Sequence, residues 1–161
     1  MTCLSLVPVT DADRFSLADL MASSMAPIAR THGLAWNPGR ERAALRRSLR
    51  PGEDRVIRWT GRTAGVFSVR DQGTRFYLLH LVIDPAFRGL GIGSTLLRRL
   101  TGRGADRGLP VELTVFSRSP ARGLYERVGF RPVLETDTRA RMRYTPDSAA
   151  CDHRVHRAQT P

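Results

Sequence analysis

Three glycines crowd into five positions of the stretch VIDPAFRGLGIGSTLLRRL, which runs from Val82 to Leu100. Gly89, Gly91 and Gly93 stand between an apolar run and a segment with helical spacing. Glycine lets a backbone approach a ligand closely and adopt positive φ, so several N–H groups can point into one concavity. A helix that begins directly after such a turn adds unpaired N–H groups and the positive end of its dipole. The turn therefore predicts an anion site, best suited to phosphate.

Two common phosphate-binding signatures do not fit this turn. The dinucleotide fingerprint GxGxxG would need a third glycine at the position of Leu96, and the preceding strand follows a meander rather than opening a βαβ unit. The Walker pattern GxxxxGKS/T needs a lysine, and the sequence has none. The spacing that does fit is RxxGxG, formed by Arg88, Gly91 and Gly93.

This spacing, directly after a strand that ends in Val-Ile-Asp-Pro, resembles the cofactor loop of the GNAT superfamily of N-acetyltransferases. A second block, VELTVFSRSPARGLYERVGF, is similar to that family's strand, loop and helix in the same order. The resemblance extends from Leu4 to Tyr144. It implies an acyltransferase that uses acetyl-CoA as co-substrate. The acceptor would be a primary amine of a small molecule or of a protein N-terminus, attacking directly in a ternary complex.

The resemblance also implies where the cofactor binds. The pyrophosphate of acetyl-CoA would bind the backbone amides of the glycine turn. The pantetheine arm would pair with the end of the preceding strand, which would splay apart from the next strand to admit it. Ser119 stands where relatives carry an asparagine that contacts the cofactor, and its hydroxyl could replace part of that hydrogen bonding. The predicted cofactor-binding residues are Val82, Ile83, Arg88, Gly89, Leu90, Gly91, Ile92, Gly93, Ser94 and Ser119.

Two catalytic residues follow from the same resemblance. An amine with a pKa near ~10 is mostly protonated at pH 7, so a base must take its proton. Many relatives carry a glutamate on the central strand as a candidate for this base. In this sequence His80 is in the middle of that strand, and it is either the base or a core histidine whose hydrogen bonds are satisfied. Glu112 on the neighbouring strand and a water chain are the other candidates. Tyr125 matches the helix tyrosine usually assigned as the acid for the departing thiolate; the alternative is a packing aromatic. A backbone N–H near Val82 could polarise the thioester carbonyl.

The acceptor is scarcely specified by the sequence. In this family the acceptor pocket is built mainly by the first two helices and the closing strands. His32, Trp36 and Trp59 are candidate pocket walls, with packing as the alternative for each. Lining arginines would discourage a cationic acceptor and suit one with a carboxylate or phosphate. The identity of the amine, and whether the acyl group is longer than acetyl, stay open.

Two other functions compete with this interpretation. The missing strand carboxylate and Ser119 are compatible with an acyl-CoA-binding module that lacks catalysis. The formal charge of +11 comes entirely from 26 arginines, which could contact nucleic acid. They are scattered from Arg14 to Arg157 without a run of five or six, so we expect a solvated surface and no nucleic-acid partner. Assembly as a homodimer is left open.

The elements that must position these residues follow from hydrophobic periodicity. Apolar residues at three- and four-residue spacing predict helices that begin near Asp13 and Pro38, and alternation predicts three antiparallel strands between 55 and 84. A helix, a strand, a helix and one or two closing strands follow. The expected order is β-αα-βββ-α-β-α-β(β). We therefore expect an α+β fold: a mixed, mostly antiparallel sheet of six to seven strands, flanked by about four helices.

Two of the predicted strands have a distinctive pattern. The segment Arg75–Asp84 is apolar on both faces, which is typical of a central, fully covered strand. Near the end of the chain, Ala140, Met142 and Tyr144 alternate with arginines, which predicts a half-exposed edge strand.

Length and composition predict one domain over residues 1–145 and a disordered tail over 146–161. Cys3 and Cys151 have no framework spacing, so we expect no disulfide scaffold. Cys151 could form a metal site with His153 and His156, but three ligands in a tail are weak grounds, and we expect no metal. No apolar run approaches the ~20 residues that cross a bilayer, and no signal peptide is apparent. We expect a soluble cytoplasmic protein without a membrane partner.

Overall fold

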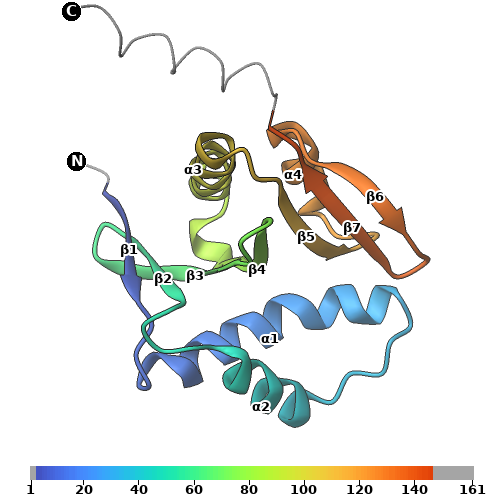
Figure 1. Ribbon diagram of the computed structural model, residues 1–161. Coiled ribbons are helices and arrows are strands. Elements are labelled where there is room, and N and C mark those ends of the chain that lie inside the picture. The colour runs from blue at the N-terminus through green and yellow to red at the C-terminus, as the bar shows by residue number, and fades with distance from the viewer. Residues whose placement is uncertain (1–2, 147–161) are drawn as a thin grey trace, which may run out of the picture. The chain divides into compact units, whose positions relative to one another are not determined.

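The computed structural model describes residues 3–146, which form a mixed sheet and its helices (Figure 1). In chain order the elements are β1 (Leu4–Pro8), α1 (Asp13–Thr31), α2 (Pro38–Ser48), β2 (Arg55–Trp59), β3 (Arg62–Asp71), β4 (Phe76–Ile83), the short 3₁₀ turn η1 (Pro85–Phe87), α3 (Ile92–Arg107), β5 (Val111–Phe116), α4 (Arg122–Val128), β6 (Arg131–Glu135) and β7 (Arg139–Tyr144). Across this part of the chain, every helix falls short of the length and apolar character that a bilayer crossing requires.

The seven strands form one sheet in the order β1-β2-β3-β4-β5-β7-β6. The β4·β5 pair is parallel, whereas the β1·β2, β2·β3, β5·β7 and β6·β7 pairs are antiparallel. This confirms the predicted α+β fold, with a mostly antiparallel sheet and four α-helices.

The chain divides into two compact units. Among the described residues, the first unit comprises the chain up to Val69 together with Leu79–Gly93, and the second comprises Arg70–Leu78 together with the chain from Ser94 onward. The single domain expected over residues 1–145 stays a prediction. The expected disordered tail lies outside the described residues from position 147 on.

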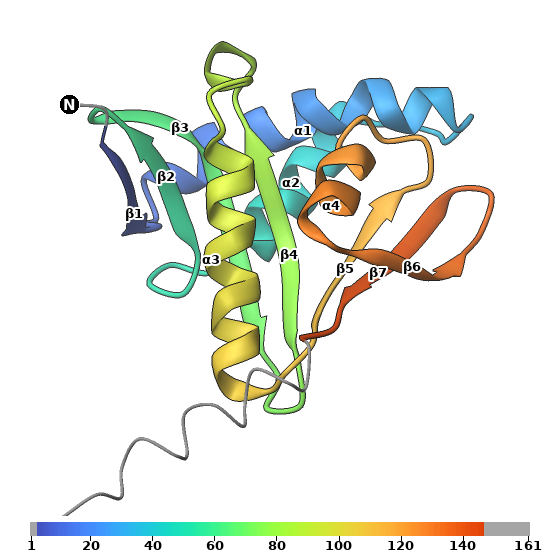
Figure 2. The same ribbon diagram turned by 90° about the horizontal axis from the view of Figure 1, so that it is seen from above.

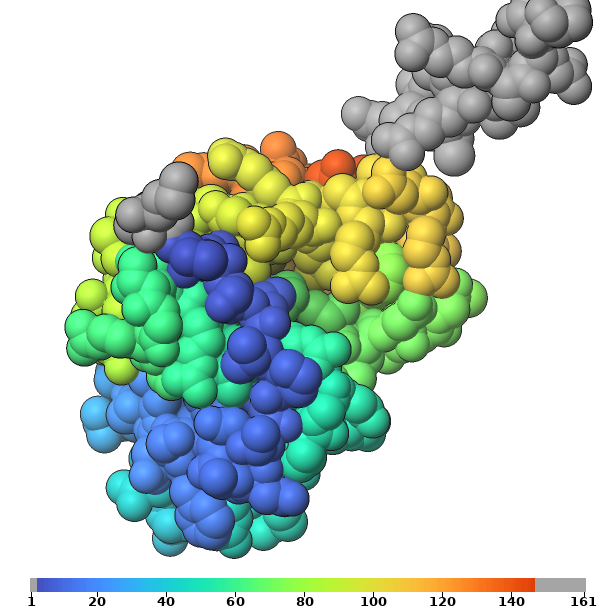
Figure 3. Space-filling view, turned by 90° about the vertical axis from the view of Figure 1, so that its left-hand side faces the viewer, coloured from blue at the N-terminus to red at the C-terminus, as the bar shows by residue number. Residues whose placement is uncertain are grey.

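The first unit packs α1 and α2 on one side of β1, β2 and β3 (Figure 1). Asn37 begins α2 by accepting a hydrogen bond from the Arg40 N–H at 3.0 Å, and Pro38 follows in the first turn. The Arg14 guanidinium on α1 donates to the Arg46 carbonyl of α2, tying the two helices together. Figure 3 looks onto β1, the strand at this edge of the sheet. The core is made of Val9, Leu17, Ala18, Met21, Ala22, Leu45, Leu49, Val56 and Val66.

The second unit contains most of α3, the strands β5 to β7 and α4. Leu96, Leu97 and Leu100 of α3 are buried, as their spacing predicts. The helix continues through Gly102 and Gly104. A Cβ at Gly104 would lie 2.7 Å from the Leu109 carbonyl oxygen, so only glycine lets the chain fold back this closely.

Two strand predictions are wrong in part. Leu79 of β4 is 39% exposed, so the segment 75–84 is not covered on both faces throughout. Leu79 lies on the face of β4 opposite to the buried Phe76 and Leu78, and that face is open to solvent at this position. The alternation over 139–144 is confirmed, with Ala140 and Met142 buried, but β7 lies between β5 and β6 rather than at the edge. One solvated face suffices for alternation in an interior strand.

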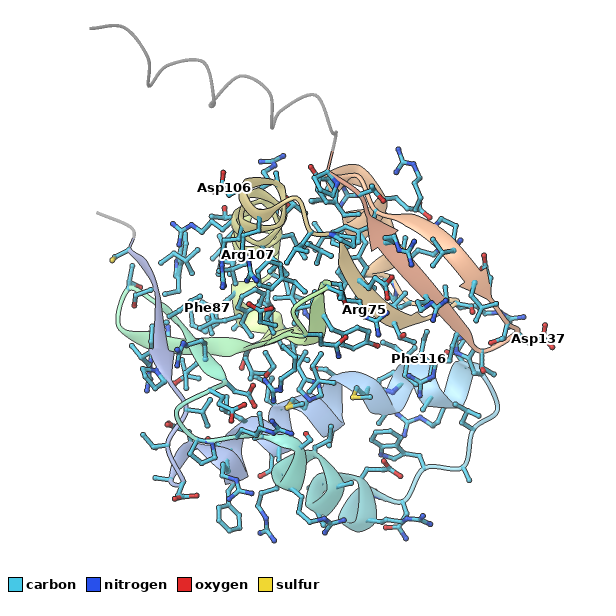
Figure 4. All side chains as sticks on the ribbon, viewed as in Figure 1. Arg75, Phe87, Asp106, Arg107, Phe116 and Asp137 are labelled. Carbon is cyan, nitrogen blue, oxygen red and sulfur yellow. The ribbon has the colours of Figure 1, made fainter. Side chains whose placement is uncertain are left out.

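In the ion pairs on the surface of the second unit, arginine is the positively charged partner. Arg107 at the end of α3 pairs with Asp71, and Arg122 of α4 pairs with Glu126 and Glu135. Figure 4 shows Arg107 on α3 and Asp137 at the tip of the β6–β7 turn. Such exposed pairs contribute little to the stability of a fold, because water screens both charges.

Candidate active site

The glycine turn leaves the end of β4, passes through η1 and returns as α3 (Figure 2). The Asp84 carboxylate accepts a hydrogen bond from the Ala86 N–H at 2.8 Å and so starts η1. The Arg88 Nε donates back to the Ile83 carbonyl at 3.1 Å. Phe87 is buried, with the Arg62 guanidinium 5.2 Å above its ring. These contacts fix the strand end to the start of the turn.

Two of the three glycines have a conformation that other residues avoid. Gly89 has φ 77° and Gly91 has φ 75°, and a Cβ added to either would meet nothing within 4 Å. The turn therefore has open space beside its backbone, followed at once by the first N–H groups of α3. This fits the predicted cradle for a phosphate-bearing ligand. The other predicted residues of the turn are Leu90, which is 49% exposed, Ile92 and Gly93, which are buried, and Ser94, which is half-buried.

The end of β4 has different main-chain groups on its two edges. A Cβ at Gly65 of β3 would lie 2.0 Å from the Val82 carbonyl oxygen, and the Asp84 N–H donates to the Ala64 carbonyl at 2.9 Å. Both groups therefore point toward β3. Because successive residues of a strand direct these groups to opposite sides, those of Ile83 face away from β3. Of the two residues predicted to pair with the pantetheine arm, Ile83 has its main chain on that edge and Val82 does not.

The even-numbered side chains at the end of β4 face the helices α1 and α2. Val82 packs against the core of the first unit, and His80 contacts Ser48 at the end of α2. Asp84 lines a pocket together with residues of α1 and α2. The period of two therefore places His80, Val82 and Asp84 on one face. The sequence shows this alternation, but the position of Asp84 in the pocket wall was not predicted from it.

Ser48 connects the end of α2 to His80. Ser48 Oγ donates to the Leu45 carbonyl at 2.7 Å and lies 3.3 Å from His80 Nε2. This contact holds the imidazole ring against the end of α2 in either tautomer.

Glu112, the alternative base, is held in a buried ion cluster of the second unit. Its side chain is 2% exposed and contacts Arg75 at 3.1 Å and Arg143 at 2.6 Å. Each carboxylate oxygen already accepts from a guanidinium group, so taking a proton would break these contacts. This arrangement favours a structural role for Glu112.

Tyr125 lies in α4 and is 7% exposed. Its ring packs edge-on against Phe130, with centroids 5.9 Å apart, and Phe130 in turn packs against Tyr144. Burial raises the pKa of Tyr125 to about 12, because the charged form would lose its hydration. The hydroxyl is therefore protonated throughout the physiological range and can donate a proton, not accept one. Gly129, with φ 111°, ends this helix and lets the chain turn into Phe130.

Ser119 shapes the turn before α4. Its Oγ accepts from the Ala121 N–H at 3.2 Å, and its own N–H donates to the Phe116 carbonyl at 2.9 Å. The hydroxyl proton is not used by the Ala121 contact, so it could still be donated to a ligand.

A pocket of about 580 Å³ lies between α1, α2 and the end of β4. Such a volume is within the usual range for small-molecule sites, about 300–1,000 Å³. Its wall includes Asp19, Arg30, Trp36, Arg42 and Asp84. Among the candidate walls from the sequence, Trp36 lines this pocket, whereas His32 and Trp59 do not.

The other two candidate wall residues, His32 and Trp59, lie elsewhere in the first unit. The His32 Nδ1 lies 2.9 Å from the Ile28 carbonyl at the end of α1, and Trp59 pairs with Leu4 and Arg62 in the sheet. Arg30 and Arg42 could not be distinguished from the other arginines by sequence, because only the packing of α1 against α2 brings them to one pocket.

Over residues 3–146, no three His, Cys, Asp or Glu side chains gather as a metal site would require. The weak candidate ligands Cys151, His153 and His156 lie outside the described residues.

Comparisons with known proteins agree with this geometry. A family model described as "Acetyltransferase (GNAT) domain" matches residues 35–147. A comparison with curated protein sequences finds no match. Among solved structures, the PaiA N-acetyltransferase of Thermoplasma acidophilum, in complex with coenzyme A, is 14% identical with a TM-score of 0.69. The alignment covers 89% of this chain and 99% of that one.

Two further structures have the same fold. A histone acetyltransferase HPA2 and related acetyltransferase from Corynebacterium glutamicum is 21% identical, with a TM-score of 0.66 and coverage of 89% and 96%. Naa50 of Arabidopsis thaliana, in complex with the bisubstrate analogue CoA-Ac-MVNAL, is 18% identical, with a TM-score of 0.60 and coverage of 88% and 98%. Because the family model matches well over half of the sequence, the chain belongs to the GNAT family of N-acetyltransferases.

Proposed function

We propose that this protein transfers the acetyl group of acetyl-CoA to a primary amine of a small molecule, by direct attack in a ternary complex. The observation that supports binding of acetyl-CoA is the turn after β4. There Gly89 and Gly91 adopt positive φ beside open space, and α3 begins at Ile92. The amides of residues 88–94 would bind the pyrophosphate. Family members use acetyl-CoA, which supplies an activated thioester when bound.

The edge of β4 that faces away from β3 suits the pantetheine arm and the thioester. Past Leu78 this edge has no further β5 partner in the register, and Ile83 directs its main-chain groups there. Main-chain N–H groups of this segment would polarise the thioester carbonyl, because fixed donors stabilise the negative charge that develops on oxygen. Val82 would contribute by packing against the core.

His80 and Tyr125 are the residues we propose for proton transfer. His80 shares its face of β4 with Asp84, which lines the pocket, and the contact with Ser48 holds its ring in place. The neutral imidazole would take the proton of the amine. Tyr125 would protonate the departing thiolate. Its pKa of about 12 keeps the proton on the hydroxyl until a strong base forms.

The pocket between α1, α2 and the end of β4 is the proposed acceptor site, since Asp84 directly follows the strand that would hold the thioester. A protein N-terminus is the second candidate acceptor. It is favoured by the Naa50 neighbour, whose bisubstrate analogue carries a peptide. The acyl-CoA-binding module without catalysis is a third candidate.

One experiment separates these functions. Free thiol release from acetyl-CoA is followed across small amines and peptides, beside a thermal-shift titration with CoA. Stabilisation by CoA and turnover of a small amine support the proposal. Stabilisation without turnover supports the binding module. If CoA at a hundredfold excess over a plausible Kd gives no stabilisation, where ~2.7 kcal/mol is expected, the donor site is wrong.

Tyr125→Phe tests the acid. The change removes the hydroxyl and keeps the ring that packs on Phe130, so CoA stabilisation should stay near that of the wild type. The kcat should fall by about tenfold or more, as for loss of a general acid. Unchanged kcat would remove Tyr125 from the chemistry.

A further inference from the structure

The charged side chains of the acceptor pocket are not equivalent. Asp19 of α1 and Arg42 of α2 both line it, and they pair with each other, Arg42 Nε lying 3.4 Å from Asp19 Oδ1. Each therefore partly neutralises the other. The charges that remain for a ligand are those of Asp84 and Arg30.

Asp84 offers one carboxylate oxygen to the pocket. Oδ1 accepts from the Ala86 N–H, which fixes the side chain at the start of η1. Within residues 3–146, Oδ2 has no hydrogen-bond partner. An ammonium or amine group is the natural ligand of such an oxygen, since it brings N–H donors and the opposite charge.

Arg30 supplies the complementary charge at the far end of α1. It lies in the last turn of the helix and lines the pocket, and its guanidinium makes no ion pair or hydrogen bond with any other described residue. The stretch of α1 from Asp19 to Arg30 spans about 16 Å, at 1.5 Å per residue. The pocket wall along α1 is therefore long enough for an extended small molecule.

Between these charges the wall is mostly apolar. Leu20, Ala22 and Ala26 of α1 line it, and Trp36 is held in place because it also packs against the core of the first unit. An apolar middle with an acidic and a basic end matches an amino acid whose amine and carboxylate are at opposite ends of its carbon chain. A polyamine or aminoglycoside would bring a positive charge against Arg30 instead.

We propose that the acceptor is a small ω-amino-acid-like molecule that carries a primary amine at one end and a carboxylate at the other. Asp84 Oδ2 receives the amine beside the end of β4, and Arg30 binds the carboxylate. This rests on the proposed acetyl transfer and adds the substrate class to it. A protein N-terminus has no carboxylate at a fixed separation from its reacting amine, so it would not use Arg30 in this way.

The test compares acids with their amides. Free thiol release from acetyl-CoA is measured with matched pairs: 4-aminobutanoate and 4-aminobutanamide, 5-aminopentanoate and 5-aminopentanamide, and 6-aminohexanoate and 6-aminohexanamide. Each amide keeps the amine and the carbon skeleton and loses the negative charge. For at least one pair the acid should have a kcat/KM about tenfold or more above that of the amide.

Variants assign this preference to the two residues. Arg30→Ala should lower kcat/KM for the acid by about tenfold and leave the amide unchanged, and Arg30→Lys should restore part of the loss. Asp84→Asn should lower kcat/KM for both members of a pair, while its Oδ1 still accepts from the Ala86 N–H. Arg40→Ala is the matched control, because Arg40 is an exposed arginine of α2 that does not line the pocket.

The outcomes distinguish this inference from the proposed function. Equal kcat/KM for acids and amides, or an equal loss for both in Arg30→Ala, overturns the zwitterionic acceptor and leaves acetyl transfer standing. So does turnover confined to peptide N-termini. No CoA stabilisation, or no thiol release with any amine, overturns the proposed function itself and the inference with it.

Discussion

Replacing Gly65 with alanine should disturb both the stability of the sheet and the position of the acyl donor. Gly65 lies in β3 against the end of β4, and a Cβ there would be 2.0 Å from the Val82 carbonyl oxygen and 3.1 Å from the Ile83 Cα. Ordinary contact begins at 3.4 Å, so β3 and β4 must separate locally by about 1.4 Å. The obstacle is backbone, which cannot rotate away as a long side chain could.

The expected cost is worked from these contacts. Overpacking of this kind costs about 1–3 kcal/mol. The neighbouring hydrogen bond from the Asp84 N–H to the Ala64 carbonyl would stretch, which adds about 1 kcal/mol. We therefore expect Gly65→Ala to lower the free energy of unfolding by about 3 kcal/mol. Gly73→Ala is the control, because Gly73 has φ 79° with open space around it and should cost only about 1 kcal/mol in backbone strain.

Urea denaturation followed by tryptophan fluorescence measures both variants. With similar m-values, the difference in midpoints gives the difference in stability. Under conditions where both variants are folded, kcat/KM for the best amine should fall further in Gly65→Ala than in Gly73→Ala, because only Gly65 faces the strand end proposed to hold the thioester. If Gly65→Ala is no less stable than Gly73→Ala, the close approach of β3 to Val82 is not real, and the assignment of main-chain groups to the two edges of β4 loses its basis.

Three further predictions concern the glycine turn, the buried ion cluster around Glu112 and Tyr125 of α4. Gly91→Ala should cost about 1 kcal/mol in strain at φ 75° and raise the Kd for CoA in calorimetric titration; an unchanged Kd would exclude the turn as the phosphate site. Glu112→Gln should lower the free energy of unfolding by about 2 kcal/mol. The loss should be smaller than for a fully buried ion pair, because Arg75 and Arg143 are about 40% exposed and can be rehydrated. An unshifted urea midpoint would contradict this. The pKa of Tyr125 is about 12 in the folded chain and about 10 in the unfolded chain, so the unfolded chain loses the proton first. The free energy of unfolding should therefore fall by up to about 3 kcal/mol as the pH rises from 10 to 12. Tyr125→Phe should lack this part of the alkaline loss, and an identical pH profile would show that the hydroxyl is not buried.

The conformation of the glycine turn could be predicted from the sequence because its determinants are local. The glycines at 89 and 91 adopt the positive φ that their type favours, and the helix after them begins where the apolar spacing starts. The order of strands and helices was also accessible, since a period of two or of three to four residues is a local property. The exposure of Leu79 was not, because Leu79–Ile83 is mostly apolar, like a covered strand, and the sequence does not show what covers each face.

The pocket proposed for the acceptor could not be predicted, for a related reason. Arg30, Arg42 and Asp84 come from three elements that are distant in the chain. Nothing in the sequence separates the two arginines from the others, and only the structure shows that Arg42 pairs with Asp19. The contact of His80 likewise joins it to a hydroxyl 32 positions away.

The surface built from guanidinium groups has a practical consequence for an enzyme that consumes an acyl thioester. The 161 residues contain no lysine, so the folded protein presents no side-chain amine to its own donor. A guanidinium group stays protonated at every working pH and has no lone pair for attack on a thioester. Any Nε-acetyl-lysine that forms in a mixture with this enzyme must therefore be on another chain. Amine-reactive reagents will also find no side-chain amine on this protein, so side-chain labelling in such a mixture reports on the other components.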